Sequence, residues 1–122
     1  MREFKTDLTG KVAVVTGARQ GLGKIFATAL AAAGAEVIIM ARNVKALEEA
    51  AAEIHAETGA ICHYCPIDIL DESSVERAAR FVMDTCGRLD ILFNNAALGR
   101  GSTPLQDTSL EEWNATIGTN LT

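Results

Sequence analysis

The sequence predicts an α/β fold built on a doubly wound parallel sheet, and three observations carry this prediction. Short apolar runs rich in Val, Ile and Leu alternate with amphipathic helical patterns along the chain of 122 residues. Glycines follow the helical patterns, and short polar residues precede them. Strand–helix–strand repetition with right-handed crossovers gives a parallel sheet covered by helices on both faces. The expected strand order is 3-2-1-4.

The expected strands are the four short apolar runs, which suit strands buried on both faces. They span residues 11–16, 36–40, 60–65 and 89–94. Three helices lie between them, with apolar residues at the i, i+3, i+4, i+7 spacing of a buried helix face. The expected faces are Leu22, Ile25, Phe26, Ala29, Leu30 and Ala33; Val44, Leu47, Ala51 and Ile54; and Val75, Ala78, Ala79, Val82 and Cys86.

The helix boundaries agree with this periodicity. Asn43 and Asp71 stand where the second and third helices need N-caps, and their side-chain oxygens accept hydrogen bonds from the first helical N–H groups. Gly34, Gly59 and Gly87 each come just after a helical pattern, where a left-handed residue ends a helix. We therefore expect helices that begin and end at these positions.

Length and charge restrict the class of protein. At 122 residues the chain is at most one domain, large enough to bury a core. The net charge is −5 with acids and bases interspersed, so no basic surface is expected for nucleic acid. The apolar stretch 25–35 is too short to span a bilayer, and residues 1–7 lack an apolar signal segment. We expect a cytoplasmic protein.

The cysteines are expected to be structural and to belong to a reducing compartment. Cys62 and Cys65 form a CxxC spacing, but an offset of three in a strand sends side chains to opposite faces. No second pair of ligands follows, and a redox CxxC would stand at a helix N-terminus.

The run from Thr16 to Gly23, TGARQGLG, carries the functional information because it joins a strand to a helix. Gly17 permits the sharp turn, Gly21 lets the backbone approach a pyrophosphate, and Gly23 allows close packing of helix on strand. Backbone N–H groups and the positive end of a helix dipole then meet at one point. The sequence thus predicts a Rossmann-like dinucleotide site, although a glycine run alone is a weak signal.

A second motif makes the prediction specific. Asn94-Asn95-Ala96-Ala97 follows the fourth strand, and the pair of motifs resembles the TGxxxGxG and Asn-Asn-Ala-Gly of the short-chain dehydrogenase/reductase family. The resemblance runs from Gly10 to the last residues, with Ala97 in place of the family's usual glycine. It implies hydride transfer between a nicotinamide and a small carbonyl or secondary-alcohol substrate. It also implies cofactor contacts by Arg19, Gln20 and Leu22 beside the three glycines.

The end of the second strand favours NADP(H) over NAD(H). Enzymes that prefer NAD place an acid about 20 residues after the glycines to bind the ribose 2′-OH, and this chain has Ala41 and Arg42 there. A guanidinium donates bidentate hydrogen bonds to a 2′-phosphate. We expect Arg42 to be the main contact and Arg19 a helper. The alternative is that Arg42 is an ordinary solvated residue.

The resemblance also implies roles for residues at the other strand ends. Asp68 would accept a hydrogen bond from the adenine amino group, and the Ile69 backbone would lie at the ring edge. The alternative for Asp68 is a turn aspartate. Asn94 and Asn95 would bond backbone at the rim of the sheet, and Ala96 would lie against the ribose. Asn120 would support a water-linked proton relay.

The family's catalytic serine, tyrosine and lysine are missing. The one tyrosine is Tyr64, with Asp68 four residues later, and neither His55 nor His63 is expected near the cofactor. We favour a fragment, a single dinucleotide-binding domain over 1–122 that is incomplete at its C-terminus. A binding-only module is one alternative. Another nucleotide enzyme such as a methyltransferase is disfavoured, since Ala41 leaves no acid for a ribose diol.

The expected fragment would lack the strand that pairs with the outer side of the fourth strand. The fourth strand would lie at an exposed sheet edge with Leu89, Ile91 and Leu92, and such an edge is a template for association. We therefore expect a homo-oligomer.

Overall fold

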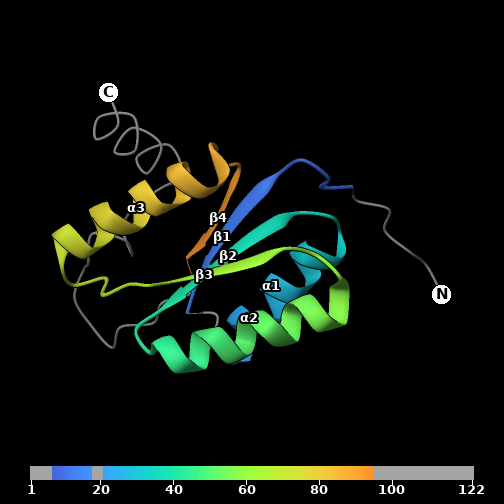
Figure 1. The fold of residues 1–122 in the computed structure, drawn as a ribbon, viewed down its shortest axis with the longest axis horizontal. Helices are drawn as coiled ribbons and strands as arrows, with labels where there is room; N and C mark the ends of the chain where they lie inside the picture. Colours follow the sequence, from blue (N-terminus) through green and yellow to red (C-terminus); the bar gives the residue numbers. More distant parts are fainter. Residues whose placement is uncertain (1–6, 18–20, 95–122) are drawn as a thin grey trace.

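The chain folds as a four-stranded parallel sheet with helices on both faces (Figure 1). This computed structural model describes residues 7–17 and 21–94. The elements are β1 (Val12–Thr16), α1 (Gly21–Ala32), β2 (Glu36–Ala41), α2 (Val44–Thr58), β3 (Cys62–Pro66), α3 (Glu72–Cys86) and β4 (Ile91–Asn94). The strands lie in the order β3-β2-β1-β4, so the predicted fold class and topology are confirmed. The order reverses between β1 and β4.

The two central strands are the most buried part of the sheet. All five residues of β1 and the four middle residues of β2 are buried, whereas the residues of β4 are half-buried. Val14 pairs with Ile38 on one side and with Leu92 on the other. Leu89, expected at an exposed edge, is in fact buried, because it precedes β4 and packs in the cluster on the α3 face.

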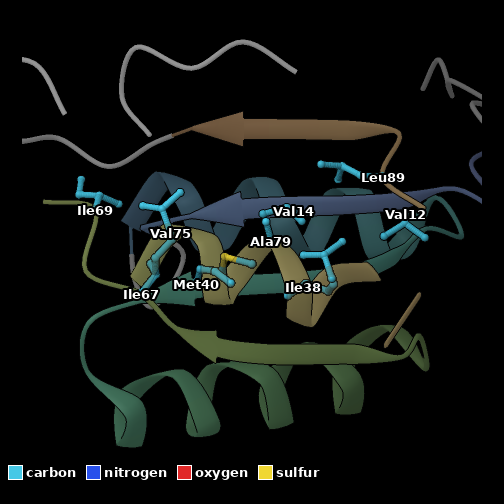
Figure 2. Close-up of a cluster of buried hydrophobic side chains, with 11 residues drawn as sticks. Val12, Val14, Ile38, Met40, Ile67, Ile69, Val75, Ala79 and Leu89 are labelled. Carbon is cyan, nitrogen blue, oxygen red and sulfur yellow. The ribbon is translucent and has the colours of Figure 1, made fainter. Parts of the chain in front are cut away.

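Alternation along the strands divides the core into two layers. Ala13 and Val15 pack with α1 and α2, and Val12 and Val14 pack with α3. Figure 2 shows the second layer, in which Val14, Met40 and Val75 are among the labelled side chains. The glycine turn after β1 is therefore carried by a strand that is fixed from both sides.

Helix α1 buries only part of the face that the periodicity predicted, together with a row of small residues. Leu22 and Ile25 are 63% and 67% exposed, while the buried residues are Gly23, Ala27 and Ala31. These three follow an i, i+4, i+8 row of small residues, which lets the helix backbone lie close to the sheet. The prediction was wrong for Leu22 and Ile25 because it weighted hydrophobicity over size, whereas the predicted Phe26 and Leu30 are half-buried and pack against the same layer.

The buried faces of the other helices largely follow the prediction. In α2, Leu47 and Ile54 are buried, but Val44 is the first helical residue and is 48% exposed. In α3 the expected residues are buried, apart from the half-buried Cys86 at its end. No helix in the described part of the chain is both long and apolar enough to cross a membrane.

Both predicted N-caps and the glycine C-caps of α2 and α3 are confirmed. The Asn43 side chain accepts a hydrogen bond from the Ala46 N–H at 2.9 Å. The Asp71 side chain accepts one from the Ser73 N–H at 3.0 Å. The glycines that follow the three helices all have positive φ: Gly34, Gly59 and Gly87. These caps fix the residues at which each helix begins and ends, and so where its loops lie at the ends of the strands.

The CxxC residues lie on opposite faces of β3, as predicted. Cys62 packs against the α1–α2 layer and Cys65 against the α3 layer. Together with Cys86 they are free thiols in the described ranges. No disulfide or paired-thiol chemistry joins them.

Candidate cofactor site

The carboxyl ends of all four strands meet at one edge of the sheet because the strands are parallel. Thr16 pairs with Met40 and Asn94, and Ala41 pairs with Pro66. These strand ends therefore lie side by side, although they are far apart in the sequence. We call this edge the carboxyl edge.

The glycine turn leaves β1 at this edge. Gly17 has φ 68°, and its N–H donates to the Met40 carbonyl oxygen at 2.7 Å. Gly21 opens α1 with φ 67°, a conformation that disfavours any residue with a Cβ. The first turn of α1 carries no acidic residue, and its Lys24 side chain pairs with Glu53 of α2. A helix N-terminus presents free N–H groups and the positive end of the helix dipole, which suits an anion.

A hydrogen bond holds β1 and β4 together where the strand order reverses. The Thr16 hydroxyl is fully buried and donates to Asn94 Oδ1 at 2.9 Å. The partner of Asn94 in this contact is a side chain, and the bond from Asn94 to backbone at the rim stays a prediction. It fixes the last residues of the two strands between which a dinucleotide would lie.

A cleft of about 380 Å³ opens beside the ends of β2 and β3. Its lining residues are Arg42, Cys65, Pro66, Ile67, Asp68, Ser74, Arg77 and Ala78. Arg42 is exposed and directly follows β2. Arg77 adds a second guanidinium from α3 and donates to Ser73 Oγ at 3.2 Å. The sequence had no signal for Arg77, because nothing in its spacing separates it from Arg80 on the same helix.

Asp68 organises the turn between β3 and α3. Its carboxylate accepts a hydrogen bond from the Leu70 N–H at 3.1 Å, and its own N–H donates to Ser74 Oγ at 2.9 Å. These two bonds show that Asp68 acts as a turn aspartate, which is the alternative that the sequence left open. Asp68 also lines the cleft, so a role toward a ligand stays a prediction. The Ile69 side chain is buried in the α3 layer, which anchors the same turn.

The described residues at this edge include seven of the site residues named from the sequence. These are Gly17, Gly21, Leu22, Gly23, Arg42, Asp68 and Ile69. The remaining ones lie outside the described residues: Arg19, Gln20, Asn95, Ala96 and Asn120.

The other titratable candidates contact partners away from the glycine turn. A ring nitrogen of His55, Nδ1, lies 2.8 Å from the Ala60 carbonyl oxygen, and the Tyr64 hydroxyl donates to Glu48 at 3.4 Å. Burial raises the pKa of the Cys62 thiol to about 11. A thiol with so high a pKa is protonated at neutral pH and is a poor nucleophile.

The comparison with protein families agrees with the fold and the glycine turn. The family model described as short chain dehydrogenase matches residues 11–122, and the chain belongs to this family. A short chain dehydrogenase/reductase of Aspergillus oryzae, astE, is 39% identical over 98% of this chain and 46% of its own length. D-threitol dehydrogenase of Mycolicibacterium smegmatis is 38% identical over 98% of this chain and 45% of its own length. The chain thus spans about half the length of these relatives.

Solved structures show the same fold. L-sorbose reductase of Gluconobacter frateurii, complexed with NADPH and L-sorbose, is 31% identical and covers 93% of this chain and 42% of its own, with a TM-score of 0.75. A metagenomic short-chain oxidoreductase in complex with NADP is 38% identical and covers 93% of this chain and 51% of its own, with a TM-score of 0.72.

Proposed function

We propose that this chain forms the cofactor-binding part of an NADP(H)-dependent short-chain reductase. In the whole protein, hydride would pass between the nicotinamide and a carbonyl or secondary-alcohol substrate. The relatives are about twice as long as this chain, so we place the catalytic tyrosine and lysine in a part of the protein outside these residues. Asn120 would supply the proton relay that the family resemblance implies.

The observation that carries the cofactor assignment is the exposed Arg42 directly after β2, beside the cleft. Ala41 stands where an NAD-preferring site has a carboxylate. A 2′-phosphate at the cleft would meet the guanidinium groups of Arg42 and Arg77 and would receive charge-assisted hydrogen bonds from them. Two similar proteins are NADPH or NADP complexes in their solved structures, which supports the same preference.

The residues of the carboxyl edge fit the rest of a dinucleotide. The N–H groups at the start of α1 would bind the pyrophosphate, with Gly21 leaving room for it. Asp68 and the Ile69 backbone would lie at the adenine, and Asn95 and Ala96 at the rim and the ribose. The bound nicotinamide would supply the hydride chemistry, while these residues hold and orient it.

Calorimetric titration with NADPH and then NADH at low salt tests this proposal. We expect NADPH to bind more tightly, and Arg42→Ala to weaken NADPH binding while leaving NADH binding nearly unchanged. Hydrogen bonds to a charged group contribute about 1.5–3 kcal/mol, which corresponds to about 10- to 150-fold in affinity. Arg80→Ala is the matched control, since Arg80 is exposed on α3 and does not line the cleft.

Each contrary result has a defined meaning for the proposal. Equal binding of NADPH and NADH would contradict the role of Arg42. An equal loss in Arg80→Ala would show that only net charge matters. No binding of either dinucleotide would contradict a cofactor-binding role for these residues.

A further inference from the structure

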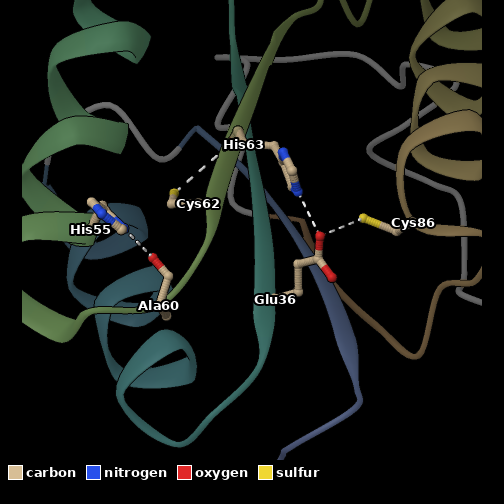
Figure 3. Close-up of polar contacts among 6 residues, drawn as sticks. All are labelled: Glu36, His55, Ala60, Cys62, His63 and Cys86. Carbon is tan, nitrogen blue, oxygen red and sulfur yellow. Dashed lines mark hydrogen bonds and ion pairs between the residues drawn. The ribbon is translucent and has the colours of Figure 1, made fainter.

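Three side chains from three elements meet on the α3 side of the sheet, near the amino ends of β2 and β3 (Figure 3). Glu36 is the first residue of β2, His63 lies in β3 and Cys86 is the last residue of α3. His63 Nε2 lies 2.6 Å from Glu36 Oε2, and the Cys86 Sγ lies 3.5 Å from the same oxygen. The three ligand atoms all lie within 4.8 Å of one another.

The fold itself produces this convergence. Glu36 has the same parity along β2 as Ile38, whose side chain packs on the α3 face, so both point to that face. His63 pairs with Ile38 in the parallel register. Helix α3 covers the same face and ends there, with Cys86 packed against its layer. The three groups are therefore held by two strands and a capped helix end rather than by a loop.

The donor set and its spacing suit a zinc ion. Imidazole nitrogen, carboxylate oxygen and thiolate sulfur are the usual ligands of Zn²⁺, at about 2.0–2.3 Å. Tetrahedral geometry at those bond lengths separates nitrogen from oxygen by about 3.3 Å and sulfur from oxygen by about 3.6 Å. The Cys86–Glu36 separation of 3.5 Å already fits. The His63–Glu36 pair must open by less than about 1 Å, within the range of side-chain rotation.

The surroundings of the cluster carry charges of both signs. The C-terminal end of α3 carries the negative end of the helix dipole, and its last turn has no basic residue. Two basic residues, Lys11 and Arg88, line a neighbouring cleft of about 360 Å³ together with Glu36 and Cys86. The Arg88 guanidinium is engaged by Asp90 at 2.8 and 2.9 Å. The side chains of His63 and Glu36 are 26% and 34% exposed, so an ion can enter.

We propose that Glu36, His63 and Cys86 form a Zn²⁺ site, with a water molecule as fourth ligand from the adjacent cleft. On binding, the Cys86 thiol loses its proton to solvent. The His63 Nε2 lone pair then faces the metal, with the ring hydrogen on Nδ1. The ion would join β2, β3 and α3 away from the glycine turn, and it would stabilise the folded chain because it binds only the assembled site.

Titration of the chelator-treated 122-residue chain with Zn²⁺ and with Co²⁺ tests this site. We expect one ion per chain, a Zn²⁺-dependent rise in the melting temperature, and a thiolate-to-Co²⁺ charge-transfer absorption. Cys86→Ser and His63→Gln should each weaken binding at least tenfold, and Cys86→Ser should abolish the absorption. Cys62→Ser and His55→Gln are matched controls, because they remove a thiol and an imidazole outside the cluster, and they should bind normally.

The opposite results would overturn the proposal. These are the absence of saturable binding, binding that survives Cys86→Ser, or an equal loss in the control variants. Far-ultraviolet circular dichroism shows whether each variant is folded. If Cys86→Ser does not fold, Glu36→Gln carries the test, since it keeps the side-chain volume and removes one anionic ligand.

Discussion

A single added methyl group at Gly34 tests how the loop between α1 and β2 is packed. Gly34 has φ +107°, and a Cβ built there would lie 2.8 Å from Thr9 Oγ1 and 3.1 Å from the Thr9 backbone nitrogen. The backbone next to Thr9 cannot retreat freely, because the Leu8 N–H donates to the Ala33 carbonyl oxygen at 2.8 Å. Gly34→Ala should therefore destabilise the fold through both conformation and contact.

Gly59 separates these two effects. It also has positive φ, +77°, but a Cβ there would meet no atom within 4 Å. The left-handed conformation costs a non-glycine residue about 1–2 kcal/mol, and alanine recovers about 0.4–1 kcal/mol by restricting the unfolded chain. Gly59→Ala should thus cost about 0–1.5 kcal/mol by these terms. Gly34→Ala adds an overpacking cost of about 1–3 kcal/mol.

Urea unfolding followed by circular dichroism measures both variants. We expect the free energy of unfolding to fall by about 1–3 kcal/mol more in Gly34→Ala than in Gly59→Ala. Thr9→Ala removes the nearest atom, Oγ1, and should restore part of the stability in the Gly34→Ala background. Equal losses in the two glycine variants would refute the claim that Thr9 confines this turn.

Two further predictions concern the ends of the sheet. Hydrogen bonds from the Arg88 side chain hold the pKa of Asp90 below its usual value of 3.8, and Asp90 also accepts from the Val12 N–H at 2.8 Å. A lowered folded pKa gives stability that is present above the unfolded pKa and lost as pH falls through the folded one. The stability difference between the chain and Asp90→Asn, measured by urea unfolding, should therefore shrink below about pH 4. Among the described strands β4 pairs only with β1, and an unpaired strand edge can pair with a second chain. Light scattering at high concentration should therefore give a mass above that of one chain. A clean monomer would contradict association through this edge.

Much of the fold was predictable because local patterns and global packing agree. The apolar runs of β1 and β2 are buried on both faces, and the caps at Asn43 and Asp71 begin their helices. Such features depend on residues close together in the sequence. The face of α1 was not predictable from hydrophobicity, because Ala27 and Ala31 are selected by the distance between helix and sheet. That distance is a property of the packed structure.

At the carboxyl edge, too, some features depend on residues close together in the sequence and others depend on packing. The glycine turn was predictable because glycine is the residue that adopts positive φ without strain, and Gly17 and Gly21 both adopt positive φ. The position of Arg42 at the carboxyl edge was predictable because Arg42 directly follows β2. Arg77 reaches the cleft only because α3 packs with that side of its first turns toward β3. A rotation of the helix by one residue would place a different side chain there, and the sequence spacing does not fix the rotation.

The Glu36–His63–Cys86 cluster shows where sequence reasoning ends. His63 is 27 residues from Glu36, and Cys86 is 50 residues from it, with no ligand spacing that resembles a metal motif. The cluster requires the register that sets His63 beside Ile38 and the length of α3 that brings Cys86 back to the start of β2. A shift of one residue in that register would turn His63 to the opposite face of the sheet. In β3 the side chains alternate between the two faces of the sheet, so Cys62 and Cys65 lie on opposite faces although their spacing resembles a CxxC motif. His63, which stands between them in the sequence, lies on the face that Cys86 reaches. The chemistry of this face therefore comes from strand register and not from the motif that the sequence displays.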